Sequence, residues 1–425
     1  MASPMGPSLW SETAPPAPVF PALTASTTAD VLVVGGGYTG LSAALHLAEA
    51  GTGVCLVEAN APGWGASGRN GGQVNPSLKH DPDELVRQLG ATQAEALIDA
   101  VSGAADLVFS LVARHAIDCH PVRNGWLQLA YAERDVPALH ARARQWQRRG
   151  VAVDMLDRAD VERRVGTHAF AGGWLDGRAG AIQPLAYAHG LARAARQAGA
   201  AIHGNTRVRS LARQGGSWIA TLDTGATVRA ERVLIATNGY SDGLWPGLRQ
   251  TLLTANSFIV ATRPLPGGTA GTILPKGETA STSQRLLLYF RKDHTGRLLI
   301  GGRGYFTDPS HPRDFAHLER SVALLFPQLG PLETEYRWAG RIAVTRDFMP
   351  HVHEPAPGIT MAVGCNGRGI ALCTSLGKHL ATRMAGGPAP IPFPVSPLKP
   401  IPFHGLQRLY IAAGVAWYSL LDKIA

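Results

Sequence analysis

Lysine, cysteine and long hydrophobic runs are scarce or absent in this 425-residue chain. Only six of its 40 basic residues are lysine, so arginine carries most of the formal net charge of +9. The densest arginine stretch, residues 142–149, has the spacing of one exposed helix face and does not form the basic stripe that nucleic acids bind. A nucleic-acid partner is therefore not expected.

The small number of cysteines excludes the common metal and disulfide frameworks. Cys55, Cys119, Cys365 and Cys373 form no C-x-x-C pair and have no zinc-ligand spacing, so no metal site is predicted. This usage is typical of a reducing compartment, where disulfides do not persist. It favours a cytoplasmic location.

No hydrophobic run reaches the roughly 18 residues that a membrane span needs, so no span is predicted. Residues 1–28 are rich in Pro, Ala, Ser and Thr, and they lack the basic start and continuous apolar stretch of a signal peptide. We expect them to form an irregular N-terminal arm, anchored by Trp10 and Phe20. Residues 396–425 are expected to form a C-terminal tail whose apolar end packs against the protein.

Charged residues make up only 17% of the chain, whereas glycine contributes 49 residues. Much of the interior must therefore be packed by small residues. The apolar content of 45% excludes wholesale disorder. The length exceeds what one compact core usually holds, which favours two domains or one elaborated domain.

A glycine-rich turn between a strand and a helix is the first candidate site. Residues 30–34 have the β-branched pattern of a strand buried on both faces, and they lead into the G-x-G-x-x-G motif of residues 35–40. A strongly helix-forming segment, 41–50, follows, and a second strand is predicted at 54–57. This order of elements predicts dinucleotide binding. The alternative is a glycine-rich turn in an unrelated α/β domain.

The glycines of this motif have separate physical roles. Gly35 allows the tight turn, Gly37 lets the backbone approach a pyrophosphate, and Gly40 lets helix and strand pack closely. The helix N-terminus adds donors and a positive dipole for the phosphates. Glu58 ends the second strand, where a carboxylate accepts hydrogen bonds from ribose hydroxyls and repels a 2′-phosphate, so NADP is disfavoured.

A second glycine-rich segment, residues 63–73, indicates whether the dinucleotide is FAD or NAD. An NAD-binding domain would normally continue into its next helix at this point. A backbone this permissive indicates close approach to a second, bulky part of the ligand. Ser67 and Asn70 offer hydrogen-bonding groups for a pyrophosphate or ribityl chain, and Arg69 offers charge. The segment favours FAD, and the alternative is a surface loop.

The two glycine-rich segments together resemble the glycine/D-amino-acid oxidase (DAO) family of FAD-dependent oxidoreductases. The resemblance is greatest to the branch typified by γ-glutamylputrescine oxidoreductase, and it extends from Ala29 to about His404. It implies an α/β (mixed α+β) fold with a glutathione-reductase-type, Rossmann-like FAD-binding domain, discontinuous in sequence, and an inserted antiparallel-sheet substrate domain. The implied FAD-binding domain comprises residues 29–118, 166–245 and 336–395, and the implied substrate domain comprises residues 119–165 and 246–335.

Two later segments carry the same resemblance. Residues 231–240 match a strand of the family and the segment after it, which crosses close to FAD. Residues 359–371 match the family's last strand, glycine-rich turn and helix. The N-terminus of that helix would point at the flavin O2 locus, where its dipole stabilises the charge of the reduced flavin. The alternative for this turn is a plain strand–helix connection. The cofactor-binding residues implied by the resemblance are Gly35, Gly37, Tyr38, Thr39, Gly40, Glu58, Ala59, Ala66, Ser67, Arg69, Asn70, Gly71, Gly72, Gln73, Val208, Thr237, Asn238, Gly239, Gly364, Gly367, Arg368, Gly369 and Ile370.

The resemblance also bears on how FAD is held. Some relatives attach it covalently through a histidine in the first glycine-rich segment or a cysteine in the C-terminal part. Here Arg69 and Asn70 stand at the first place, and Cys365 does not align with the attaching cysteine. Non-covalent FAD is therefore expected. No second G-x-G-x-x-G with strand–helix context is found, so no NAD(P)H domain is expected.

The expected substrate contacts centre on residues 338–350, which resemble the family's W-x-G-x-x-x-x-T-x-D-x-x-P stretch. Amino-acid-oxidising members place an arginine two residues after Gly340, where it clamps the substrate carboxylate. Ile342 occupies that place, and the neighbouring Arg341 should point to the opposite face of the strand. This favours an amine or polyamine-type substrate. The residues expected to line the pocket or act in catalysis are Trp338, Arg341, Tyr289 and Arg291.

The resemblance implies an FAD-dependent amine oxidoreductase, either an oxidase or a dehydrogenase. The C–H bond next to the amine nitrogen would lose hydride to flavin N5, the imine would hydrolyse, and O2 or another acceptor would reoxidise the flavin. A small-molecule amine such as γ-glutamylputrescine is the expected substrate. One alternative is oxidation of glycine, sarcosine or a D-amino acid, and the other is a flavin-binding protein without turnover.

Overall fold

The first sheet begins with two parallel strands and the helix that connects them. The computed structural model describes residues 7–284, 286–305, 307–331, 333–387, 390–407 and 409–412. β1 (Thr27–Val34) pairs in parallel with β2 (Val54–Val57), and α2 (Tyr38–Glu49) connects them. The whole of β2 and the second half of β1 are buried. The β-branched run thus forms a strand covered on both faces, as predicted.

The first sheet follows the path β17–β18–β11–β1–β2–β8, and a hairpin of β9 and β10 extends from β11. Its core strands are parallel, and β17 adds an antiparallel edge. This order places β1 and its turn at the centre of the sheet. The further strands are β8 (Ala201–His203), β9 (Val208–Gln214), β10 (Ser217–Leu222), β11 (Thr227–Ile235), β17 (His351–Ala356) and β18 (Ile359–Val363).

Helix α2 packs between α8 (Pro184–Gln197) and α11 (Gly369–Met384) on one face of this sheet. Gly377 permits the close approach of α11, because a Cβ there would lie 2.5 Å from the backbone oxygen of Thr39. The N-terminus of α11 is thereby fixed near the N-terminus of α2.

One stretch, Ala91–Arg114, is long and apolar enough to cross a membrane by length and composition alone, although no such run was expected. In the structure it divides at Gly103 into α4 (Ala91–Ser102) and α5 (Ala104–Arg114). Both helices contribute side chains to the main hydrophobic core, and α5 packs against α11. α4 and α5 therefore pack as core helices of the protein. The preceding helix is α3 (Pro82–Leu89).

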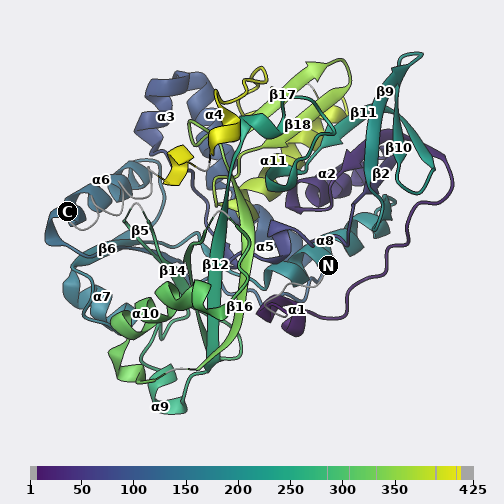
Figure 1. Cartoon of the computed structure of the whole chain (residues 1–425). Coiled ribbons are helices and arrows are strands. Elements are labelled where there is room, and N and C mark those ends of the chain that lie inside the picture. The colour runs from purple at the N-terminus through teal and green to yellow at the C-terminus, as the bar shows by residue number, and fades with distance from the viewer. Residues whose placement is uncertain are drawn as a thin grey trace.

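The second sheet follows the path β16–β12–β15–β14–β13–β4–β6–β5. It is antiparallel, as expected, except for the parallel pair β4–β13. The long strands β12 and β16 run side by side through the molecule (Figure 1). Its strands are β4 (Trp126–Ala130), β5 (Val153–Leu156), β6 (Gly172–Asp176), β12 (Leu253–Pro264), β13 (Thr279–Thr282), β14 (Tyr289–Lys292), β15 (Arg297–Arg303) and β16 (Thr334–Val344), and its helices are α6 (Val136–Gln147), α7 (Arg158–Val165), α9 (Gly267–Ala270) and α10 (Ala316–Leu325).

The strand pairing departs from the expected division of the chain at two strands. β6 and β16 belong to the second sheet, although segments 166–245 and 336–395 were expected in the FAD-binding domain. β16 pairs with β12 along nearly its whole length and has no partner among the described strands of the first sheet. A short two-stranded pair, β3 (Gln73–Val74) with β7 (Gly180–Ala181), connects the second glycine-rich segment to the region before α8.

The N-terminal arm is more ordered than expected. It contains the short helix α1 (Leu9–Thr13), capped by the Ser8 side chain, which accepts from the N–H of Ser11. Trp10 and Phe20 are buried, which confirms their predicted anchoring role. Residues 1–6 lie outside the described part of the chain, as do Arg408 and residues 413–425 of the expected C-terminal tail.

Candidate active site

The turn between β1 and α2 has the geometry that its motif predicts. Gly35 has φ +111°, and a Cβ there would lie 2.9 Å from the backbone oxygen of Ala236. A Cβ at Gly40 would lie 2.0 Å from the backbone oxygen of Gly35. Both positions therefore exclude larger residues. The chain passes close to itself here and opens the N-terminus of α2 toward a cleft, as a dinucleotide-binding turn requires.

Glu58 is held at the end of β2 by two backbone donors. Its Oε2 accepts from the N–H of Gly36 at 2.7 Å, and its Oε1 accepts from the N–H of Asn60 at 2.9 Å. Each carboxylate oxygen keeps a further lone pair. Because Glu58 also lines the cleft, these lone pairs are available to ribose hydroxyls.

The cleft has a volume of about 640 Å³, which suits a large cofactor. It is lined by residues of the turn between β1 and α2, of the second glycine-rich segment and of the segment that follows β11. Trp64, Thr206, Arg207 and Tyr240 also line it and were not predicted. The predicted cofactor residues along it are Gly35, Gly37, Tyr38, Thr39, Glu58, Ala59, Ala66, Ser67, Val208, Thr237, Asn238 and Gly239.

A second cavity, of about 170 Å³, continues from the cleft. The two spaces share Tyr38, Ala66, Ser67, Asn238, Arg341 and Cys373, and we call this common region the junction. The structure thus brings all three predicted glycine-rich segments to one place. Further predicted residues along the second cavity are Arg69, Asn70, Gly71, Gln73, Tyr289, Gly367, Arg368, Gly369 and Ile370.

Three predicted glycines have supporting positions outside both linings. Gly40 packs against the strand, as described above. The N–H of Gly364 donates to Asn238 Oδ1 at 3.0 Å and so fixes an amide at the junction. A Cβ at Gly72 would lie 2.5 Å from Arg291 Nη2, so this glycine lets the loop lie against that guanidinium.

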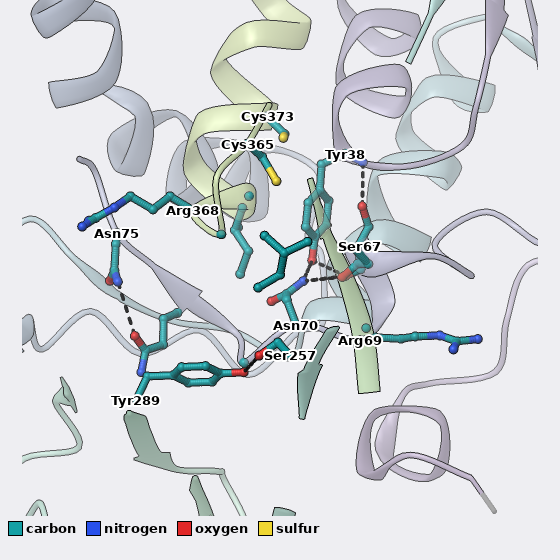
Figure 2. Close-up of a pocket in the computed structure, with 18 of the residues that line it drawn as sticks. Tyr38, Ser67, Arg69, Asn70, Asn75, Ser257, Tyr289, Cys365, Arg368 and Cys373 are labelled. Atoms are coloured by element: carbon teal, nitrogen blue, oxygen red, sulfur yellow. Dashed lines mark hydrogen bonds between the residues drawn. The ribbon is translucent and has the colours of Figure 1, made fainter. Parts of the chain in front are cut away.

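Hydrogen bonds between Tyr38, Ser67 and Asn70 fasten the first two glycine-rich segments together (Figure 2). The N–H of Tyr38 donates to Ser67 Oγ at 3.0 Å, and its hydroxyl donates to the backbone oxygen of Ser67 at 2.5 Å. Asn70 Nδ2 donates to the Tyr38 hydroxyl at 3.1 Å. Burial holds the pKa of Tyr38 well above its usual value, so the phenol stays neutral. The network shapes the wall of the junction.

Tyr289 lines the second cavity from β14, as predicted. Its hydroxyl forms a hydrogen bond of 2.7 Å with Ser257 Oγ on β12, and burial raises the pKa of Tyr289 to about 12. The ring lies close to the backbone at Gly71, where a Cβ would come within 2.6 Å of it. Tyr289 therefore offers a neutral hydroxyl and cannot serve as a base near neutral pH.

Trp338 and Arg291 do not line either space, although both were expected to. Trp338 is buried, and its Nε1 donates to the backbone oxygen of Arg69 at 2.9 Å. Arg291 donates through Nη2 to the backbone oxygen of Ile182 at 2.8 Å and stacks on Trp10. Their side chains support the second glycine-rich segment on the side that faces away from the cavity. They position the loop and do not face the cavity.

Arg341 and Ile342 both reach the second cavity, but with different surroundings. The Arg341 guanidinium lies 3.3 Å from Asp308 Oδ2 and 5.5 Å from the centre of the Tyr240 ring, and it is about half exposed. Ile342 lies across from Gly367, in the turn before α11. The place where a carboxylate clamp would stand is therefore an apolar wall, as Ile342 led us to expect, and Arg341 is directed toward Asp308.

Sequence reasoning missed several polar residues of the second cavity. Asn75 and Lys79 follow β3, Trp126 begins β4, and Ser257 and Ser281 lie on β12 and β13. None of them belongs to a local motif, so only the tertiary fold identifies them. All four cysteines are free thiols, and within the described ranges no group of three or more His, Cys, Asp or Glu could hold a metal ion.

Comparison with known proteins agrees with this geometry. The family described as FAD dependent oxidoreductase (DAO) matches residues 30–383. The chain is 35% identical to "Probable oxidoreductase OrdL" of Rhizobium meliloti over 99% of both chains, and 33% identical to gamma-glutamylputrescine oxidoreductase of Escherichia coli over 95% of both. The crystal structure of glycine oxidase from Geobacillus kaustophilus superimposes with a TM-score of 0.73 at 23% identity, over 88% of this chain and 99% of that one.

The chain therefore belongs to the DAO family of FAD-dependent oxidoreductases. The mixed α/β fold and the FAD cofactor predicted from the sequence are confirmed, as is an enzyme acting on a C–N bond. The fit to FAD is also visible in the cleft itself, in the crowded glycine turn, the Glu58 carboxylate and the joined second cavity. Non-covalent attachment and the roles of single residues stay predictions.

Proposed function

We propose that the protein oxidises an extended primary amine of the polyamine type, for which γ-glutamylputrescine is the reference compound. The observation that carries the proposal is Ile342, an apolar residue in the cavity at the place expected for an arginine that clamps α-amino acids. The 33% identity to gamma-glutamylputrescine oxidoreductase over 95% of both chains supports the same substrate class.

Bound FAD would supply the acceptor for the two electrons and the hydrogen of the C–H bond next to the amine nitrogen. The chain's own residues orient the substrate around this acceptor. Gly367, Gly369 and Ile370 place the first turn of α11 along the second cavity, so the positive end of that helix lies near the junction. Tyr289 and Ser257 offer hydroxyl groups at the opposite wall.

The charge of the cavity keeps the reacting amine neutral. An amine must be deprotonated to be oxidised, and neighbouring cations lower the pKa of an ammonium group. The described lining of the second cavity includes no Asp or Glu that would stabilise an ammonium group, whereas the positive end of α11 lies near the junction. We infer that this surrounding favours the uncharged form without a dedicated base.

Oxidation of glycine, sarcosine or a D-amino acid is the rival activity, and it would need the carboxylate clamp near Ile342. The likeness to glycine oxidase at 23% identity supports the fold and not this substrate. The enzyme class established by the comparisons disfavours a flavin protein without turnover. Free thiols and the absence of zinc spacing support a cytoplasmic location as part of the proposal.

An anaerobic spectrum of the holoenzyme tests the proposal. We expect γ-glutamylputrescine to bleach the flavin band, and glycine, sarcosine and D-alanine to leave it largely unchanged. Bleaching by the amino acids alone would establish the rival activity. A peroxide assay under air then separates an oxidase, which releases peroxide, from a dehydrogenase that uses another acceptor.

A further inference from the structure

Two cations lie together in the part of the second cavity that is separate from the junction. Lys79 comes from the loop between β3 and α3, and Arg368 immediately precedes α11. Arg368 donates through Nη1 to Ser77 Oγ, and its guanidinium lies 5.3 Å from the Trp126 ring centre. Figure 2 shows the Arg368 side chain directed toward Asn75 and away from Tyr38 and Ser67.

Neither cation has an acidic partner among the ion pairs of the described residues. The Nε of Arg368 is buried and has no hydrogen-bond partner in the described structure, and the same is true of Asn75 Oδ1. Burial and the neighbouring cations lower the pKa of Lys79 to about 8, and mainly burial lowers that of Arg368 to about 10. Both groups are therefore charged at neutral pH. Buried charge without a partner is costly unless a ligand supplies one.

The nearby acids are already engaged with other arginines. Asp81 accepts from Arg142 Nε at 2.5 Å, and Asp176 accepts from Arg178 Nη2 at 2.6 Å. These pairs leave Lys79 and Arg368 as the unneutralised charges of the region. A ligand that entered this end of the cavity with a negative group would satisfy both.

We propose that Lys79 and Arg368 form an anion subsite that takes a carboxylate of the amine substrate, remote from the carbon that is oxidised. Guanidinium and ammonium groups together bind a carboxylate through several charge-assisted hydrogen bonds. The unpartnered Asn75 Oδ1 beside them accepts an N–H of the same substrate end. The subsite rests on the proposed function, and it defines the substrate class as an extended amine with a distal carboxylate, neither a simple diamine nor a small amino acid.

The subsite also explains how Ile342 and a carboxylated substrate coexist. A clamp at residue 342 would hold a carboxylate next to the reacting carbon, as in an α-amino acid. Lys79 and Arg368 hold it at the other end of the substrate, so the amine extends toward the junction. The same cavity thereby excludes glycine-like acids, which are too short to reach both ends.

The test compares two matched amines on the FAD-loaded enzyme, γ-glutamylputrescine and 4-aminobutyrylputrescine, which differ only in the carboxylate. Arg368→Met and Lys79→Met are each expected to lower kcat/KM for γ-glutamylputrescine about 10- to 100-fold, the range for a lost hydrogen bond to a charged group. The ratio of kcat/KM for γ-glutamylputrescine to that for 4-aminobutyrylputrescine is therefore expected to fall about tenfold or more in both variants, whatever each variant does to the activity that the two amines share. Equal losses for both amines would overturn the subsite, because the cations would then serve the flavin or the fold.

Control variants separate charge from structure. Arg368→Lys keeps the positive charge and is expected to retain most of the preference for γ-glutamylputrescine. Lys378→Met removes an exposed lysine of α11 outside both linings and should change neither amine. A flavin midpoint potential that matches the wild type in Arg368→Met would show that the loss is not transmitted through the cofactor.

A binding measurement keeps the subsite testable if the proposed function fails. Glutaramate has a carboxylate and an amide but no oxidisable amine, and its binding is followed by the change in flavin absorbance. Its Kd is expected to rise about tenfold or more in Arg368→Met. If the wild type oxidises neither amine but this rise occurs, the amine proposal is lost and the subsite stands. An unchanged Kd overturns the subsite whatever the activity.

Discussion

The thiol groups of Cys365 and Cys373 lie beside each other along the second cavity (Figure 2). A hydrogen bond from the Cys373 thiol, with further donors that include the N–H of Gly367 and the Asn238 side chain, lowers the pKa of Cys365. The same bond, together with burial, raises the pKa of Cys373 well above its usual value. We therefore expect the two thiols, eight positions apart in sequence, to differ in reactivity.

Selective alkylation should reveal this difference. The lowered pKa of Cys365 favours its thiolate, the reactive form, whereas burial raises the pKa of Cys55 to about 11 and that of Cys119 to about 12. A short exposure of the FAD-free protein to iodoacetamide is expected to label Cys365 first, and bound FAD should slow the reaction. Peptide mass spectrometry measures the sites, with Cys365→Ser as the control. Faster labelling of Cys373 would contradict the assignment.

Removal of the Glu58 carboxylate should weaken cofactor binding. Glu58→Ala loses the acceptor for ribose and both backbone contacts, to Gly36 and Asn60. The Kd for FAD is expected to rise about 10- to 100-fold. Glu58→Gln keeps one oxygen acceptor and should bind more tightly than the alanine variant. Flavin fluorescence titration of the FAD-free proteins measures both, and equal affinities across the series would show that Glu58 does not contact the cofactor.

An arginine at position 342 should shift substrate preference toward small amino acids. Ile342→Arg introduces a guanidinium into the cavity across from Gly367, where it can hold an α-carboxylate. The ratio of kcat/KM for glycine to that for γ-glutamylputrescine is expected to rise about tenfold or more. Ile342→Leu, which conserves volume, serves as the control. Unchanged selectivity in the arginine variant would count against our description of the pocket.

Trp10 should stabilise the loop of the second glycine-rich segment as well as the N-terminal arm. Its indole packs edge-on against Trp338, with ring centres 5.8 Å apart, and its Nε1 donates to the backbone oxygen of Asn70 at 2.7 Å. Trp10→Ala is expected to cost about 3–5 kcal/mol of unfolding free energy. Trp10→Phe keeps most of the packing and should cost about 1 kcal/mol for the lost hydrogen bond. Denaturant unfolding and FAD retention are the measurements, and an alanine variant that is as stable as the wild type would refute this role.

The preference for a carboxylated amine should fall as pH rises through about 8. Lys79 has a pKa of about 8, because burial and the facing cations Arg368 and Arg142 disfavour its charge, while Asp81 is paired with Arg142. Below this pH the protonated lysine attracts the carboxylate, and above it the charge is lost. The kcat/KM ratio of γ-glutamylputrescine to 4-aminobutyrylputrescine cancels the titration of the reacting amine, which both substrates share. Lys79→Arg should flatten the profile, and an identical decline in that variant would exclude Lys79 as its cause.

The parts of this site that are formed by contiguous sequence could be predicted, and the parts formed by distant residues could not. Residues 35–40, 63–73 and 364–369 each carry a local signal, because glycine turns and helix starts depend on near neighbours, and the structure brings them together. Lys79 and Trp126 carry no such signal, since only the packing of β3, β4 and α11 places them in one cavity.

Position along the strands explains the remaining differences. Trp338 and Arg291 share a strand face with Ile342 and Tyr289, which line the cavity, but they lie further along their strands. There Trp338 donates to the backbone oxygen of Arg69, and Arg291 stacks on Trp10. β6 and β16 belong to the second sheet because the strands with which they pair lie there. The residues near β6 and β16 in the sequence do not determine which distant strand each of them pairs with.

The pairing of β16 also determines how a substrate reaches the flavin. β16 is bonded to β12 in the second sheet, and immediately after it the N–H of Thr345 donates to Asn366 Oδ1 at 3.0 Å, while the N–H of Asn366 donates to the backbone oxygen of Ala343 at 3.0 Å. The segment after β16 and the turn before α11 are thus joined by one main-chain hydrogen bond and one bond to the Asn366 side chain. Because these bonds oppose separation of the two sheets at this point, we expect substrate and product to exchange through local movement of side chains and loops.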